Sequence, residues 1–171
     1  MTLSIALLAF ITLQRLAELV LAERNTRRLM AKGAYEAGRD HYPLIVVLHA
    51  AWLAGLWLLG WRRPINAWFL SAFFGIEALR VWTLVSLGQR WTTRIIVLPG
   101  APLVRRGPYR FMAHPNYLVV VLEIALAPLA LGMASYALLF TLLNAGVLVI
   151  RVRAETAALS LARRRGITPP P

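Results

Sequence analysis

The sequence lacks cysteine and holds little charge. None of its 171 residues is a cysteine, which excludes a disulfide framework, a thiolate zinc site and a cysteine nucleophile. Only 15% of the residues are charged, against roughly 25% in soluble domains. Because 59% of the residues are hydrophobic, we predict a membrane-embedded protein and not a soluble globule.

Acidic residues are also scarce. Seven Asp and Glu residues stand against 19 Lys and Arg residues, which gives a net charge of +12. In a soluble domain this excess would suggest a nucleic-acid partner. Here the arginines gather in three short stretches, so we expect no nucleic acid and interpret the charge as a signal of membrane topology.

Apolar stretches near the length needed to cross a bilayer, about 20 residues, occur along most of the chain. The sequence therefore predicts a single all-α integral membrane domain over residues 1–171. We expect about five transmembrane helices, over residues 2–22, 43–61, 65–88, 115–131 and 134–150. The last two are short and should form a hairpin that turns at residues 132–135.

The Lys and Arg residues of the connections predict the orientation, since positively charged loops stay in the cytoplasm. The connections over residues 23–42 and 89–114 hold five such residues each, and the tail after Ile150 holds five more. The other connections hold only Arg62 and Arg63. We predict an external N-terminus, two cytoplasmic loops over the Arg-rich connections, and a cytoplasmic, flexible tail over residues 162–171.

Five charged side chains and one histidine fall inside the predicted spans. They are Arg15, Glu18, Glu77, Arg80, Glu123 and His49. Each charge costs roughly 2.5–3.5 kcal/mol to insert, so each calls for a partner or a function. Arg15 and Glu18 are three residues apart on one helix and can pair with each other, and the same spacing lets Glu77 pair with Arg80. Glu123 has no local partner, so its counter-charge must come from another helix, from His49 or from a cationic ligand.

Two interpretations of these side chains stay open. All of them lie in the cytoplasmic half of their predicted spans, so they could line one polar chamber that opens toward the cytoplasm. Alternatively, they tie the helices together through interhelical contacts, and His49 is a hydrogen-bonded packing residue.

Residues 103–117 hold the most informative motif. Gly107-Pro108 favours a turn, and Pro115 suits the first position of a helix, because its missing N–H would have had no partner there. The free N–H groups and the positive dipole at a helix start favour a carboxylate. His114 and Tyr117 are three residues apart, so both can face the same small molecule.

Three blocks of the sequence are similar to motifs of a known family. They are Gly107-Pro108-Tyr109-Arg110, His114-Pro115-Asn116-Tyr117 and Arg151-Val152-Arg153-Ala154-Glu155. They resemble motifs of the isoprenylcysteine carboxyl methyltransferase family. The family consists of integral membrane enzymes that use S-adenosylmethionine. Residues 40–43, 88–94 and 116–123 are most similar to the bacterial branch, which is associated with methylation of lipid-like polyketides such as alkylpyrones and alkylresorcinols. The resemblance implies a multi-pass protein of a bacterial inner membrane, with its active site toward the cytoplasm.

The resemblance also implies which residues contact S-adenosylmethionine. They would be Leu103, Val104, Gly107, Tyr109, His114, Pro115, Tyr117, Arg151 and Glu155. Arg151 and the helix start could hold the carboxylate of the cofactor, and Glu155 could accept hydrogen bonds from its ammonium or ribose. Ala113 before His-Pro and Thr156 after Glu155 depart from the family pattern, which weakens the implication that isoprenylcysteine is the acceptor.

We expect methyl transfer to an oxygen of a lipophilic acceptor that arrives through the bilayer. A carboxylate acceptor, as in a prenylated thiol compound, needs no base. A phenolic or enolic hydroxyl of a lipid-like polyketide would need one, and Glu123, His49 or His114 is then the candidate. Arg94 or Arg90 could hold an anionic acceptor oxygen or bind the phosphate of a membrane lipid. No metal is expected.

Two other functions stay open on the sequence alone. Membrane sterol and steroid reductases share a similar His-Pro-x-Tyr helix start but use NADPH. A non-enzymatic transporter or assembly subunit would show interhelical charge pairs without a cavity, and it would bind neither cofactor.

Overall fold

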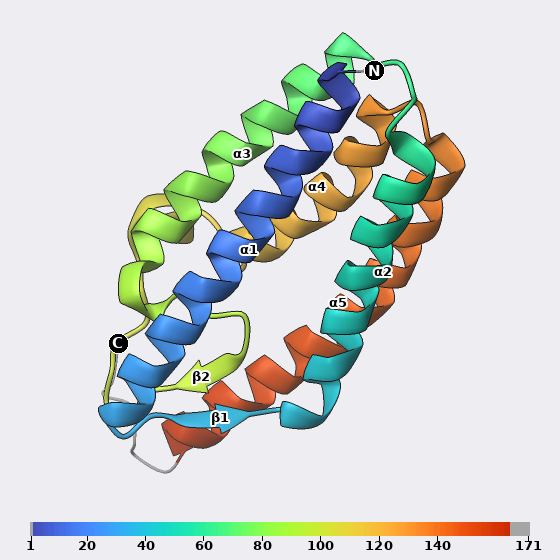
Figure 1. The fold of residues 1–171 in the computed structure, drawn as a ribbon. Helices are drawn as coiled ribbons and strands as arrows, with labels where there is room; N and C mark the ends of the chain where they lie inside the picture. Colours follow the sequence, from blue (N-terminus) through green and yellow to red (C-terminus); the bar gives the residue numbers. More distant parts are fainter. Residues whose placement is uncertain (1, 165–171) are drawn as a thin grey trace.

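Five α-helices make up most of the protein, and the computed structural model describes residues 2–164 (Figure 1). The helices are α1 (Thr2–Ala31), α2 (Tyr42–Gly60), α3 (Ala67–Leu87), α4 (Pro115–Ala130) and α5 (Ala134–Arg164). The connections hold two strands, β1 (Tyr35–Ala37) and β2 (Ile95–Val97), and three 3₁₀ helices, η1 (Arg39–His41), η2 (Gly88–Arg90) and η3 (Gly107–Arg110). The predicted helical class is confirmed, with a small sheet added to it.

The helices form an elongated bundle around an apolar core. α1 lies beside α3, α2 lies beside α5, and the two strands lie at the end of the bundle opposite the N-terminus (Figure 1). Leu8, Trp52, Phe73 and Ile124 are at most 1% exposed and belong to one cluster that joins α1, α2, α3 and α4. Large apolar side chains also cover the outer faces, with Trp68 87% exposed. Apolar exposure on this scale fits contact with lipid.

Four helices, α1, α2, α3 and α5, are long and apolar enough to cross a membrane. α4 has only 16 residues, so at 1.5 Å per residue it covers about 24 Å, less than a hydrocarbon core of about 30 Å. The predicted count of five spanning helices is therefore not confirmed. The two Arg-rich connections do lie at one end of the bundle (Figure 1), but their cytoplasmic placement stays a prediction.

Local signals in the sequence set where α3 and α4 begin. The side chain of Asn66 caps α3 by accepting hydrogen bonds from the backbone N of Trp68 (3.1 Å) and of Phe69 (3.3 Å), as amide caps commonly do. Pro115 stands at the first position of α4, as predicted. The turn into α5 uses Gly132 at φ +66°, a backbone conformation that glycine adopts without strain.

Both terminal helices run beyond the predicted spans. α1 continues nine residues past Ala22, where it is held by Asn25, which is 2% exposed and donates to the backbone oxygen of Trp91 at 2.8 Å. α5 continues past Ile150 to Arg164, so the last predicted span ends 14 residues before its helix does, and the helix enters the predicted tail. Hydropathy reports where an apolar stretch ends and not where a helix ends, which explains both errors. Residues 165–171 of the predicted tail, including Pro169–Pro171, lie outside the described residues.

The two predicted cytoplasmic loops meet in a small antiparallel sheet that the sequence analysis missed. Tyr35 pairs with Val97, and Ala37 pairs with Ile95. Ile95 and Val97 pack against Ala158 near the end of α5. The sheet therefore fixes both loops to the extension of α5, and this determines one wall of the site described below.

Candidate active site

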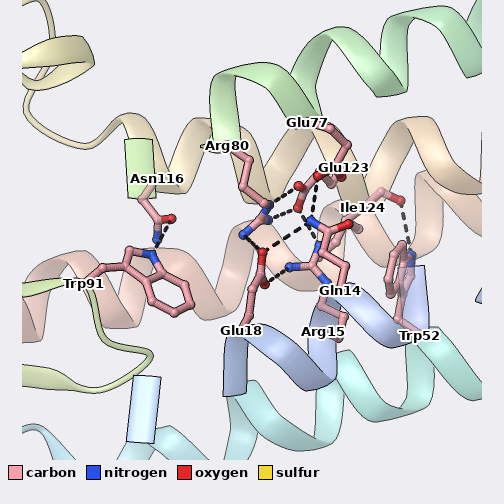
Figure 2. A network of polar contacts seen from close by, with 10 residues as sticks. All are labelled: Gln14, Arg15, Glu18, Trp52, Glu77, Arg80, Trp91, Asn116, Glu123 and Ile124. Atoms are coloured by element: carbon pink, nitrogen blue, oxygen red, sulfur yellow. Dashed lines mark hydrogen bonds and ion pairs between the residues drawn. The ribbon is translucent and has the colours of Figure 1, made fainter. Parts of the chain in front are cut away.

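The charged side chains inside the bundle gather into one ion-pair cluster, formed by Arg15, Glu18, Arg80 and Glu123 (Figure 2). Glu123 of α4 is completely buried and pairs with Arg80 of α3 and, at 2.5 Å, with Arg15 of α1. Arg15 also pairs with Glu18 at 2.7 Å, as its spacing predicts, and Arg80 pairs with Glu18 at 3.0 Å. The counter-charge of Glu123 thus comes from two other helices.

Glu77 does not pair with Arg80, so this part of the prediction is wrong. Its carboxylate accepts a hydrogen bond of 2.6 Å from Gln14 of α1 instead, because Arg80 is already committed to Glu18 and Glu123. The arrangement as a whole favours the interpretation in which intramembrane charges hold α1, α3 and α4 together. Each of the four charges in the cluster has a partner, so removal of one of them would leave a buried charge uncompensated.

The more polar of two cavities, which we call the polar cavity, has a volume of about 440 Å³ and lies at the end of the bundle that carries the sheet. Its volume is within the range of small-molecule sites, roughly 300–1,000 Å³. The loop before α4, β2, the start of α4 and the end of α5 line it. It includes seven of the nine residues predicted to contact the cofactor: Leu103, Val104, Tyr109, His114, Tyr117, Arg151 and Glu155.

Tyr117 connects the two helices that form this cavity. Its hydroxyl donates a hydrogen bond to Glu155 of α5 and accepts one of 3.0 Å from Nε of Arg151. The ring of His114 stacks on the ring of Tyr117, with centroids 5.2 Å apart and an angle of 18° between the planes. The prediction that His114 and Tyr117 face the same space agrees with this geometry.

Gly107 and Pro115 do not line the polar cavity. Gly107 has φ +57°, and a Cβ atom there would collide with the side chain of Ser86. Its place is in the close packing of η3 against α3. Pro115 is buried at the first turn of α4, so both residues shape the wall of the cavity without lining it. Tyr109, two residues after Gly107, does line the cavity, and burial raises its pKa.

A second cavity, of about 300 Å³, lies between α1, α2, α4 and α5. We call it the apolar cavity. Its apolar lining comes from Leu16, Leu19, Ile45, Val46, Leu53, Val120, Val147 and Leu148, and its polar lining includes Arg15, Glu18, Arg80, His49 and Asn144. Leu16 and Val46 are about half exposed on the outer surface of the bundle, so the cavity reaches the lipid-facing side between α1 and α2.

The two cavities share one wall. Trp91, Thr92, Asn116, Tyr117 and Arg151 line both of them. Trp91 is 3% exposed, and its indole N–H donates to Oδ1 of Asn116 at 3.3 Å (Figure 2). The two cavities therefore adjoin one another at these five residues.

The sequence analysis did not place Trp91, Thr92 or Asn116 in the site. Asn116 stands inside the His-Pro-Asn-Tyr block, so its position at the helix start was a usable signal. Trp91 belongs to a connection whose course depends on the sheet and on Asn25, and no local pattern in the sequence indicates that packing.

Three of the candidates for the base or the anion-binding residue, His49, Arg94 and Glu123, lie in different places. His49 lines the apolar cavity, and its Nδ1 lies 2.8 Å from the backbone oxygen of Ile45. Arg94 lines the polar cavity, where it contacts Glu36 at 3.3 Å and the ring of Tyr42. Glu123 lines neither cavity and is enclosed by arginines, so its geometry suits helix packing and not proton transfer. Within residues 2–164 no group of three or more metal-binding side chains occurs.

The fold is that of a multi-pass membrane protein with two adjoining cavities in its bundle. The sequence profile of the isoprenylcysteine carboxyl methyltransferase (ICMT) family matches residues 67–161, more than half of the chain. The chain belongs to this family of membrane methyltransferases. The matched region contains the whole shared wall and every predicted cofactor residue.

Two bacterial proteins are similar to the chain over most of its length. The uncharacterized protein YpbQ of Bacillus subtilis is 40% identical over 158 residues, which are 90% of this chain and 94% of that protein. An uncharacterized protein of Haemophilus influenzae is 24% identical over 153 residues, 85% of this chain and 88% of that protein. No solved structure matches.

Proposed function

We propose that the protein is an S-adenosylmethionine-dependent O-methyltransferase that acts on a lipophilic acceptor. The observation that carries the proposal is the shared wall: a polar cavity and an apolar cavity meet at Trp91, Asn116, Tyr117 and Arg151. A water-soluble donor and an oily acceptor can lie in adjoining cavities of this kind. Family membership supports methyl transfer over the alternatives of NADPH-dependent reduction and transport.

The polar cavity suits the chemistry of S-adenosylmethionine. Arg151 and the positive end of the α4 dipole would hold its carboxylate. Glu155 uses one carboxylate oxygen for Tyr117, and its other oxygen makes no hydrogen bond within the described residues, so it can accept from the ammonium. Leu103, Val104 and Leu159 supply apolar surface for the adenine. When bound, the cofactor supplies an electrophilic methyl group.

The apolar cavity suits the acceptor. Its opening between α1 and α2 is bordered by half-exposed Leu16, Leu19 and Val46, so an acceptor dissolved in the bilayer would enter without crossing water. The shared wall would hold the reacting oxygen, with the chain of the acceptor directed into the apolar part. Positioning of the two reactants then provides most of the acceleration, and the apolar lining keeps water away.

The need for a base depends on the acceptor. A carboxylate is already ionised and needs none. A phenolic or enolic hydroxyl must lose its proton as the methyl group is transferred, and His49 is better placed than Glu123 to take it. Because the backbone oxygen of Ile45 can only accept, neutral His49 carries its proton on Nδ1 and leaves Nε2 free as a base.

The proposal is tested by mass spectrometry of lipids from cells with and without the protein, grown on methionine with a deuterated methyl group. We expect at least one lipid to carry the label only when the wild-type protein is present. A Tyr117→Ala variant made at the same level should lose the product. Identical labelled lipids in all three strains would overturn the proposal.

A further inference from the structure

Asn144, in the middle of α5, is a buried amide in an apolar surrounding. It is 1% exposed, it lines the apolar cavity beside Val147 and Leu148, and its Nδ2 has no hydrogen-bond partner. A buried amide group without a partner costs free energy, so native proteins rarely leave one unused unless it serves a function.

The position of Asn144 separates it from the proposed reaction. It precedes Arg151 of the shared wall by seven residues on α5, which places it about 10 Å further into the bundle along the helix axis. A group bound at Asn144 is therefore different from the oxygen that lies at the shared wall. Leu53 and Val120 line the same cavity with apolar side chains.

We propose that Asn144 determines acceptor specificity by binding a second polar group of the acceptor, a neutral oxygen on its chain about 10 Å from the methylated oxygen. This inference rests on the proposed function, because it assumes that the acceptor occupies the apolar cavity. An in-chain hydroxyl matches the amide best, since it can accept from Nδ2 and donate to Oδ1. A plain hydrocarbon chain leaves the amide unpaired and binds more weakly, as sites built to hydrogen-bond a hydroxyl reject analogues without one.

The test uses binding without cofactor, so that it does not depend on methyl transfer. Dodecanol with a diazirine in its chain is crosslinked to the protein in lipid nanodiscs, and the labelled residues are mapped by mass spectrometry. Dodecane-1,n-diols, with the second hydroxyl moved stepwise along the chain, then compete with the label, and dodecan-1-ol is the reference competitor. We expect one position of the second hydroxyl to compete about tenfold better than dodecan-1-ol, the effect of about one hydrogen bond.

Two variants of α5 make the result specific. Asn144→Leu should abolish the advantage of the best diol and leave dodecan-1-ol unchanged. Thr141→Val is the matched control, because its hydroxyl is also buried without a partner but lines neither cavity. In Thr141→Val the diols should compete as well as they do in the wild-type protein.

The assignment would be overturned if all diols competed equally well in the wild-type protein, or if the same diol remained the best competitor in Asn144→Leu. An equal loss in Thr141→Val would also overturn it, because such a loss would indicate a general effect on the helix. Binding of S-adenosylhomocysteine should be unchanged in Asn144→Leu. If the wild-type protein does not bind S-adenosylhomocysteine at all, the proposed function is contradicted. If it binds S-adenosylhomocysteine but all diols compete equally well, this inference alone is contradicted.

Discussion

The hydroxyl of Tyr117 on α4 donates a hydrogen bond to the carboxylate of Glu155 on α5. The two residues are 38 positions apart in the chain, and they come from the two motifs that resemble the family's cofactor site. Arg151 donates to the same hydroxyl at 3.0 Å. These hydrogen bonds join the start of α4 to α5 beside the polar cavity. They also place the cationic Arg151 and the anionic Glu155 next to the same hydroxyl.

Removal of the Tyr117 hydroxyl should weaken cofactor binding without unfolding the protein. In Tyr117→Phe, Glu155 and Arg151 lose their common partner, and we expect the affinity for S-adenosylhomocysteine to fall about tenfold, as for one lost hydrogen bond. Calorimetric titration measures it. Tyr136→Phe is the control, since its hydroxyl likewise donates a hydrogen bond, to the backbone oxygen of Trp52 at 2.8 Å, but lies outside both cavities. Equal losses in both variants would contradict the role of Tyr117.

Replacement of Glu155 by Gln should separate its two proposed roles. The amide oxygen can still accept from Tyr117, but the negative charge that favours an ammonium is gone. We expect a loss of about 10- to 100-fold in affinity for S-adenosylhomocysteine, as for a charge-assisted hydrogen bond. Affinity for 5′-methylthioadenosine, which lacks the ammonium, should stay within about twofold. A loss for both ligands would move Glu155 to the ribose, and no loss for either would remove it from the site.

Disruption of the ion-pair cluster should destabilise the bundle. Arg80→Met leaves Glu123 short of one partner, and breaking such a buried pair costs about 3–5 kcal/mol. The double variant Arg80→Met with Glu123→Met should lose less than the sum of the single variants, which a double-mutant cycle of unfolding free energies detects. Arg27→Ala is the control, since its pair with Glu23 is exposed and should contribute less than about 1 kcal/mol. Strictly additive losses would show that Arg80 and Glu123 do not stabilise one another.

Gly107→Ala adds only one methyl group but should disturb the wall of the polar cavity. An alanine at φ +57° is strained, and its Cβ would also collide with Ser86. Gly33→Ala is the matched control, because Gly33 has φ +87° and open space around the added Cβ, so it carries the backbone strain of about 1–2 kcal/mol alone. We expect a larger fall in melting temperature, and weaker cofactor binding, only in Gly107→Ala. Equal effects in both variants would remove the packing role of Gly107.

Parts of this arrangement follow from local sequence signals. Pro115 predicts the start of α4 because proline lacks the N–H that a helix start leaves unpaired, and Gly132 lies within the predicted turn between α4 and α5. The pairing of Arg15 with Glu18 follows from their spacing on one helix. Each of these predictions depends on residues within about one helical turn.

Other parts depend on contacts between distant segments. Glu77 prefers Gln14 over Arg80, although Arg80 is three positions away, because Arg80 is taken by Glu18 and Glu123. The pairing of β1 with β2 joins residues about 60 positions apart, in strands too short to show an alternating pattern. Trp91 owes its place in the shared wall to this folding of the loops, so its role could not be inferred from the sequence.

The most direct test of the account is calorimetric titration of the purified protein in nanodiscs with S-adenosylhomocysteine. The account predicts saturable binding at one site per chain, abolished separately in His114→Ala, Tyr117→Ala and Glu155→Ala, with the variants still folded by circular dichroism. Unchanged affinity in all three variants, or no saturable binding by the wild-type protein, would contradict it.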